Sequence, residues 1–196
     1  MEKSSLGTLP SWDLSAWFSG KDDPRIMETL KNAHRRADDF RRAWQGKIPD
    51  AVSAEDVLRA FQEYEAIVQD ALKPLLFASA LHCLDVTDPD HGALMQKAHV
   101  VLTEIQNKLL FLELSLLGLP EEILQRLIAS DVLANYKHYL INLLKTKPHR
   151  LSEEKEQMLN DFSVTGASAF VRLFEEEFSH KKFQVMIDGK TENFTE

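Results

Sequence analysis

Seven histidines are the first candidates for chemistry, because imidazole is a common metal ligand and acid–base group. None of them is followed by Glu, and no two lie three or four residues apart, so the HExxH helix of zinc proteases is absent. Glu177 and His180 have the one-turn spacing of di-metal helix bundles, but the chain has no second Glu-x-x-His pair. We therefore predict no metal ligand and no catalytic residue in this chain. The histidines are His34, His82, His91, His99, His138, His149 and His180.

A second group of ligand-type side chains lies where a loop enters a predicted helix. It consists of Asp85, Asp88, Asp90 and His91. Acidic residues at a helix N-terminus accept hydrogen bonds from its unpaired N–H groups and complement its dipole. We interpret this cluster as helix capping rather than as a metal site.

Five small residues begin the stretch TGASAFVRLFEEEF, residues 165–178. A phosphate loop would need a second Gly followed by Lys and Ser/Thr after a strand, and a serine nucleophile would need a GxSxG turn. Gly166 stands alone, and the residues before it have helical periodicity. We expect the small residues to pack closely against a neighbour at the start of a helix. The apolar stripe would be Val164, Ala167, Phe170 or Val171, Phe174 and Phe178.

Two further side chains are unusual for their surroundings. Cys83 follows His82 directly, which puts the two about 100° apart around a helix and rules against a nucleophile–base pair. We interpret Cys83 as a buried structural cysteine. Glu113 lies within the nearly all-apolar run LLFLELSLLGL. Because an unpaired carboxylate is costly in such a place, we expect Glu113 to hydrogen-bond to a neighbouring helix.

Four arginines, Arg35, Arg36, Arg41 and Arg42, lie on the polar side of the first predicted helix. A solvated face is the expected interpretation, since exposed charges contribute little on their own. A contact surface for another domain or for an acidic peptide end is the alternative.

The bulk composition limits the classes of function. The chain has 196 residues, a net charge of −8 and a pI near 5.4, which argues against general nucleic-acid binding. A single cysteine fits a reducing compartment. The first fifteen residues contain no apolar core of signal-peptide length, and the longest apolar run, Leu109–Leu119, is roughly half of a membrane span. We predict a cytoplasmic protein with no nucleic-acid or membrane partner.

Helical periodicity dominates the elements that would position these residues. Asp23–Pro24, Ser53 and Asp88–Pro89 are cap signals, each followed by an apolar stripe at steps of three and four. Pro74 is expected to kink or end the second helix, and Gly118 to stop the third. Further helices are predicted after Pro120, from Ser130 to about Lys147, and after Ser152.

The C-terminal end has a different pattern. Alternating residues from Phe183 onward, with the turn Asp188–Gly189, predict a hairpin in which Phe183 faces Phe194 and Ile187 faces Lys190. The predicted fold is mainly α, a multi-helix bundle or array of long antiparallel helices with a short C-terminal β-hairpin. The expected domains are an N-terminal extended segment (1–22), a helical domain (23–182) and a hairpin that starts a truncated following domain (183–196).

Three sequence blocks, in order, resemble the N-terminal region of the oligoendopeptidase F family, in the thimet-type superfamily of zinc metallopeptidases. They are WDLSAWFSGKDDPRI (12–26), LDVTDPDHGALMQKA (84–98) and HRLSEEKEQMLNDFSVTGASAFVRLFEE (149–176). The resemblance extends from about Trp12 to Phe194. None of the blocks is a catalytic motif.

The resemblance implies the N-terminal helical lobe of an endopeptidase that hydrolyses oligopeptides, with this lobe lining the substrate channel. It implies zinc in the full-length family but none bound by this chain, and a missing C-terminal catalytic domain as partner. No residue here matches a zinc ligand, so we expect the chain to be inactive alone. The alternative is a stand-alone helical interaction module that has lost the catalytic domain. An exposed row of Phe174, Phe178, Phe183 and Phe194 would favour a missing lobe.

Overall fold

The computed structural model describes residues 12–48, 52–179, 181–187 and 189–194. Its α-helices are α1 (Pro24–Trp44), α2 (Ala54–Leu84), α3 (Pro89–Leu109), α4 (Phe111–Leu117), α5 (Glu121–Ala129), α6 (Lys137–Thr146), α7 (Glu153–Thr165) and α8 (Ala167–Ser179). The 3-10 segments η1 (Asp131–Tyr136) and η2 (Lys147–His149) flank α6, and the strands are β1 (Phe183–Ile187) and β2 (Lys190–Phe194). The predicted fold class, mainly α with a short C-terminal hairpin, is confirmed.

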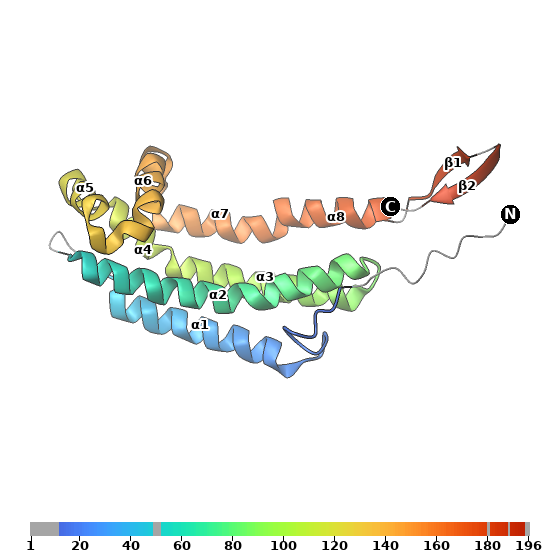
Figure 1. Ribbon diagram of the computed structural model, residues 1–196, viewed down its shortest axis with the longest axis horizontal. Helices are drawn as coiled ribbons and strands as arrows, with labels where there is room; N and C mark the ends of the chain where they lie inside the picture. Colours follow the sequence, from blue (N-terminus) through green and yellow to red (C-terminus); the bar gives the residue numbers. More distant parts are fainter. Residues whose placement is uncertain (1–11, 49–51, 180, 188, 195–196) are drawn as a thin grey trace.

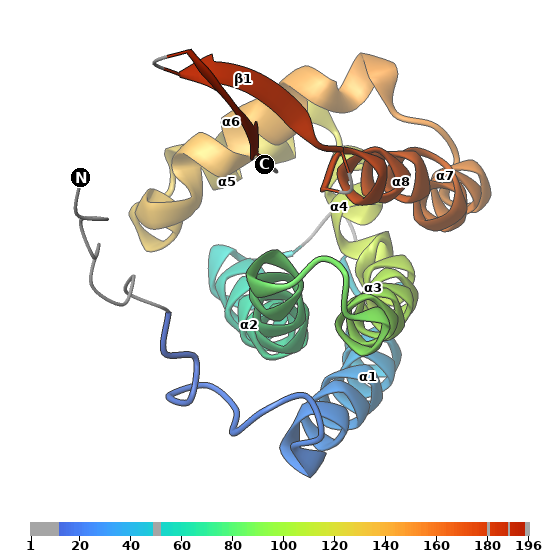
Figure 2. The same ribbon diagram turned by 90° about the vertical axis from the view of Figure 1, so that its right-hand side faces the viewer.

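The helices form an elongated array. Figure 1 shows α1, α2 and α3 running along the long axis, with α4, α5 and α6 gathered at the end where α2 begins. Helices α7 and α8 follow one another along the same axis toward the hairpin at the opposite end. The end-on view in Figure 2 places α1, α2 and α3 around a common centre, with α7 and α8 beyond α3.

The long helices begin at the predicted caps. The Asp23 side chain accepts a hydrogen bond from the Arg25 N–H at 2.9 Å, and the Ser53 hydroxyl accepts one from the Asp56 N–H at 3.1 Å. Asp88 does the same for the N–H of Asp90 at 2.8 Å. Each cap satisfies an N–H that has no partner within its own helix.

The main core lies between α1, α2 and α3 and extends into α4, α5 and α6. The predicted stripe of α1 is confirmed, because its buried residues are Ile26, Leu30, Ala33, Ala37 and Phe40. A smaller cluster includes Phe18, from the segment before α1, which is buried and meets Phe77 edge-on at a ring distance of 5.0 Å.

Three predicted helices differ from the observed ones. The third, predicted to run to Gly118, is divided at Leu110 into α3 and α4. Of the two outcomes predicted at Pro74, a kink or an end, the end is not observed: α2 continues to Leu84, with Pro74 fully buried and flanked by the buried Ala71 and Phe77. The helix predicted from Ser130 to Lys147 is divided instead. Its first part is η1, where Leu133 has φ −103° and ψ 18°, and α6 begins only at Lys137.

The C-terminal hairpin has the predicted register. Strands β1 and β2 are antiparallel, with Phe183 opposite Phe194 and Ile187 opposite Lys190. Gly189 has φ 75°, a conformation that favours glycine over residues with a Cβ. The other predicted turn residue, Asp188, lies outside the described residues.

Candidate functional site

A row of exposed apolar side chains extends along α7, α8 and β1. Phe162 on α7 is 60% exposed, Phe170 on α8 is 71% exposed and Met186 on β1 is 75% exposed. We call this row the C-terminal apolar face. Its members are Met158, Leu159, Phe162, Phe170, Val171, Leu173, Phe174, Phe183, Val185, Met186 and Ile187. Single exposed apolar residues are normal on a monomer, whereas this many on elements that follow one another indicate a candidate interaction surface.

Helix α8 is the clearest case, because none of its residues is buried. Phe174 and Phe183 are exposed as the missing-lobe interpretation expects, whereas Phe178 is only half-exposed and stacks on Phe174 at a ring distance of 4.2 Å. The side chain of Phe194 lies outside the described residues. Three of the four predicted aromatic residues can therefore be placed, and none of the three is buried in this chain.

Helix α7 holds this face in position through polar contacts with α3. Asn107 on α3 donates to the Asp161 carboxylate at 2.8 Å and accepts from the Asn160 amide at 2.9 Å. At the start of α7, Glu153 pairs with Arg41 of α1 at 3.0 Å. On helix α8, Arg172 donates a hydrogen bond to the Gln96 amide oxygen of α3 at 3.0 Å.

The small residues that begin α8 do not pack closely, so that prediction is wrong. Ala167 and Ser168 line a groove of about 380 Å³ between α8 and the α2–α3 pair, with Leu75 and Met95 on its other side. Periodicity predicts which side chains share a face of a helix, but it does not fix the distance to the next helix. Gly166 has a local role instead, since a Cβ there would lie 2.7 Å from the Phe162 carbonyl oxygen.

Glu113 has the partners that its apolar surroundings require. Its carboxylate accepts a hydrogen bond from the Tyr139 hydroxyl of α6 at 2.9 Å and forms an ion pair with Arg150 at 2.6 Å. The prediction of a hydrogen bond to a neighbouring helix is confirmed. Burial, followed by the nearby charge of Glu113, raises the pKa of the Tyr139 phenol well above its usual range.

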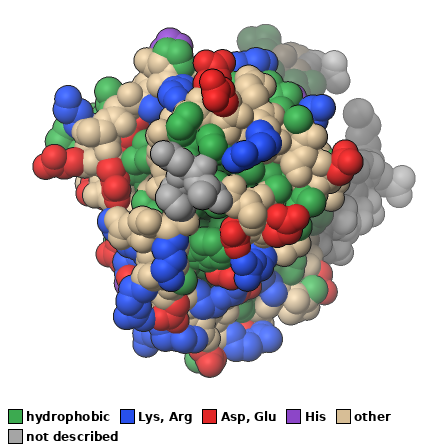
Figure 3. All heavy atoms as spheres, turned by 90° about the vertical axis from the view of Figure 1, so that its left-hand side faces the viewer, with side chains coloured by type: hydrophobic (Ala, Val, Ile, Leu, Met, Phe, Trp, Pro, Cys, Tyr) green, Lys and Arg blue, Asp and Glu red, His purple; other side chains and the backbone are tan. Residues whose placement is uncertain are grey.

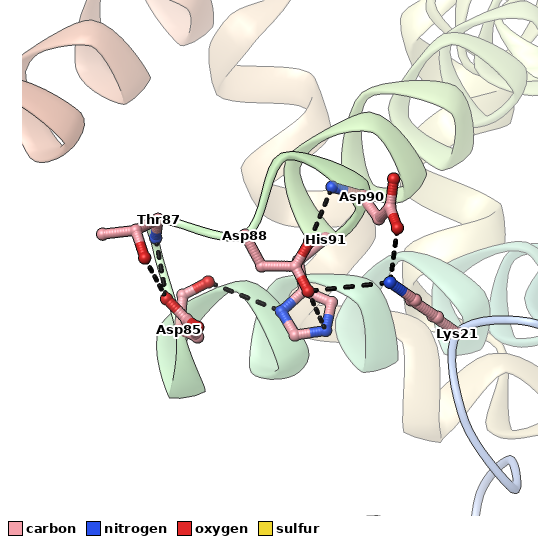
Figure 4. Close-up of polar contacts among 6 residues, drawn as sticks. All are labelled: Lys21, Asp85, Thr87, Asp88, Asp90 and His91. Atoms are coloured by element: carbon pink, nitrogen blue, oxygen red, sulfur yellow. Dashed lines mark hydrogen bonds and ion pairs between the residues drawn. The ribbon is translucent and has the colours of Figure 1, made fainter.

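The cluster of Asp85, Asp88, Asp90 and His91 forms a capped helix start (Figure 4). Asp85 accepts from the backbone N–H and the hydroxyl of Thr87, and these hydrogen bonds lower its pKa. Asp88 caps α3 and lies 3.5 Å from the His91 ring and 3.6 Å from the Lys21 ammonium. These oxygens are thus occupied by N–H and O–H donors, in agreement with the capping interpretation.

Two other sequence interpretations have different outcomes. Cys83 is exposed, so the prediction of a buried cysteine is wrong. The buried position at this turn of α2 belongs to its neighbour His82, which is 3% exposed, and the next residue consequently faces outward. The Glu177–His180 pair is not fully placed, since His180 lies outside the described residues. Among the residues that the structure describes, no group of three or more His, Cys, Asp or Glu side chains could hold a metal ion.

The arginines of α1 lie on a solvated face with internal ion pairs. Arg35 and Arg42 both contact Asp39 on the same helix, Arg36 contacts Asp70 of α2, and Arg41 contacts Glu153. Figure 3 shows basic side chains gathered over the lower part of one end of the molecule, where α1 lies, with acidic side chains between them. This arrangement fits the solvated-face interpretation.

Helix α2 is the one candidate membrane span among the described residues. Its most apolar window of 18 residues has a mean hydropathy of 1.2, which meets the length and composition criteria for crossing a bilayer. A core helix of a water-soluble protein meets the same criteria. Here α2 lies against both α1 and α3 and contributes Val57, Phe61 and Phe77 to the cores between them.

Comparisons with known proteins give one match. Residues 116–183 match the family described as Oligopeptidase F, in its N-terminal region. The matched segment begins in α4 and ends at the first residue of β1, so it contains α7, α8 and most of the exposed apolar residues described above. No curated protein and no solved structure matches the chain.

Proposed function

We propose, on the premise that residues 116–183 form an oligoendopeptidase F-like N-terminal region, that this chain is the N-terminal helical lobe of a zinc metalloendopeptidase that hydrolyses oligopeptides. In this proposal the lobe lines one side of the substrate channel and acts in the cytoplasm. The observation that supports it most directly is the C-terminal apolar face, which lies largely within the matched segment.

The partner of this face is proposed to be the catalytic domain of the same enzyme. A second domain packed over side chains such as Phe162, Phe170 and Phe174 would remove their apolar surface from water. Each Å² buried in this way stabilises the contact by about 25 cal/mol. Helix α7 is joined to α3 through the hydrogen bonds of Asn107. The part of the face on α7 is therefore held against the helical body, from which a second domain could contact it.

Zinc and the hydrolytic step are assigned to that catalytic domain. The described residues offer no group of three metal-ligating side chains, so they do not fit the donor set of a catalytic zinc, which uses three protein ligands. The proposed contribution of this chain is to position the peptide and to restrict access to the channel. We expect no peptide hydrolysis by the chain alone.

The coding DNA after codon 196 provides the first test. We expect an in-frame continuation that encodes HExxH. The longer protein encoded by that continuation should cleave a quenched fluorescent oligopeptide in a zinc-dependent way. The purified 196-residue chain, at the same concentration and with zinc added, should not cleave it. Zinc-dependent cleavage by the 196-residue chain would refute the assignment. A stop codon with no HExxH-encoding partner gene would favour the stand-alone interaction module.

A further inference from the structure

All three tyrosines of the chain line one pocket. Tyr64 on α2, Tyr136 at the end of η1 and Tyr139 on α6 surround a space of about 440 Å³, together with Phe61, Glu65 and Asn135. Segment η1, which carries Tyr136, packs against α2. Helix α2 begins at the end of the molecule opposite the hairpin (Figure 1). The pocket is separate from the C-terminal apolar face.

Three of the four aromatic rings of the pocket are linked by ring–ring contacts. Phe61 is 2% exposed, and its ring lies 4.8 Å from that of Tyr136 and 5.5 Å from that of Tyr139, the second pair at 89°. Edge-to-face and tilted pairs of this kind are mutually stabilising. Rigid aromatic walls offer partial negative charge on their ring faces, which attracts cations.

The hydroxyl protons of two tyrosines are already used. Tyr136 donates to the Glu65 carboxylate at 2.8 Å, and Tyr139 donates to Glu113 at 2.9 Å. Burial raises the pKa of both phenols, with the neighbouring carboxylates adding to the shift, so both stay protonated at neutral pH. Each phenol oxygen then has only lone pairs left to offer. A ligand that hydrogen-bonds to these two phenol oxygens must therefore supply the donors.

The charges of the pocket favour a cation. Glu113 is neutralised by Arg150 at 2.6 Å. Glu65 is exposed, and within the part of the chain that the structure describes it takes part in no ion pair; its carboxylate has the Tyr136 hydroxyl as its hydrogen-bond donor. One carboxylate is thus available for a positive charge at the edge of an aromatic pocket.

We propose that this pocket binds a guanidinium group, from an arginine side chain or from a small molecule. A guanidinium is planar, so it stacks on aromatic rings, and its five N–H donors match the acceptors on Glu65 and the phenol oxygens. An ammonium supplies fewer donors and no flat surface. This binding role is independent of the proposed peptidase function.

The three tyrosines provide a selective reporter, since every tyrosine signal comes from this pocket. The 196-residue chain with ring-labelled tyrosine is titrated with N-acetyl-arginine amide and followed by NMR. The neutral isostere N-acetyl-citrulline amide is the matched control. We expect saturable shifts of the tyrosine signals with the arginine compound alone. Equal shifts with both compounds, or no saturable shift with either, would overturn the proposal.

Two charge-matched variants test the role of Glu65. Glu65→Gln should weaken binding roughly fivefold, the effect of one exposed charge pair. Glu63→Gln is the control, because it makes the same charge change on the same helix. The Glu63 carboxylate accepts a hydrogen bond from the Trp44 indole at 3.0 Å and does not line the pocket. That control should bind as the original chain does. Equal weakening in both variants would mean that net charge, and not the pocket, attracts the ligand.

The source of the guanidinium is distinguished by two further ligands. Butylguanidine carries the group without a peptide backbone, and a blocked Ala-Arg-Ala tripeptide carries it within one, each with a single positive charge. Tighter binding of the tripeptide would identify a peptide or protein as the occupant, and tighter binding of butylguanidine a free small molecule. Failure of both to bind would refute the proposal.

Discussion

The ion pair of Glu113 and Arg150 should stabilise the fold more than any exposed pair on α1. Both side chains are less than one-third exposed, and the carboxylate also holds the Tyr139 hydroxyl. Arg150→Met removes the cation and leaves a half-buried carboxylate, so we expect the free energy of unfolding to fall by about 1–2 kcal/mol. The control Arg42→Met breaks a pair whose arginine is 76% exposed and should change it by less than about 0.5 kcal/mol. Equal losses in urea denaturation would contradict this ranking.

Asp23 makes the stability of the fold depend on pH. Its carboxylate accepts from the Arg25 guanidinium, the backbone N–H of Ser19 at 2.8 Å and the Arg25 N–H at 2.9 Å, which together hold its pKa well below the usual range. The unfolded chain has an aspartate pKa of about 3.9. A lowered folded pKa means that the stabilisation is complete above the unfolded value and is lost as the pH falls toward the folded value.

The variant Asp23→Asn isolates the contribution of the ionised Asp23 carboxylate to stability, since asparagine also caps helices well. We expect the difference in unfolding free energy between the original chain and the variant to be constant from about pH 5 to 7 and to shrink below about pH 4. Urea titrations at a series of pH values measure it. A difference that stays the same down to pH 2 would contradict the assigned cause.

At the scale of elements, the junction of α7 and α8 depends on the absence of a side chain at Gly166. A Cβ there would lie 2.7 Å from the Phe162 carbonyl oxygen, a backbone atom that cannot move aside alone. Gly166→Ala should lower the free energy of unfolding by about 1–2 kcal/mol. Gly92→Ala is the matched control, because its Cβ would meet the His82 ring at an ordinary 3.9 Å inside α3 and should stabilise by about 0.5–1 kcal/mol. Thermal unfolding of both variants would show opposite shifts.

The elements also show how far the sequence predicts the structure. Caps such as Asp23 and Ser53, and the stripe of α1, depend on local hydrogen bonds and on spacing, so they are predicted correctly. The break between η1 and α6 is not predicted from the sequence, because the non-helical backbone at Leu133 accompanies the tertiary burial of its side chain. Helix α8 has the predicted apolar stripe. Periodicity does not predict which element covers such a stripe, and no residue of α8 is buried by the parts of the chain that the structure describes.

In the candidate sites too, local sequence patterns predict that a residue needs a partner but not which distant residue provides it. Glu113 is predicted to pair because a carboxylate in an apolar run needs a partner, although its partners Tyr139 and Arg150 come from positions that no local pattern connects to it. The tyrosine pocket is missed entirely. Tyr64 and Tyr136 lie 72 positions apart and meet because η1 packs against α2.

At the scale of the whole molecule, the C-terminal apolar face should add nothing to the stability of this chain. Phe170 and Phe174 are 71% and 59% exposed, so the double variant Phe170→Gln, Phe174→Gln removes few internal contacts. We expect its unfolding free energy to change by less than about 0.5 kcal/mol and its binding of an apolar dye to fall. Phe77→Ala, at a 1% exposed core position, should cost about 3–5 kcal/mol. If the double variant instead lost 2 kcal/mol or more, the face would be covered by the chain itself, and its proposed role as an interdomain contact would fail.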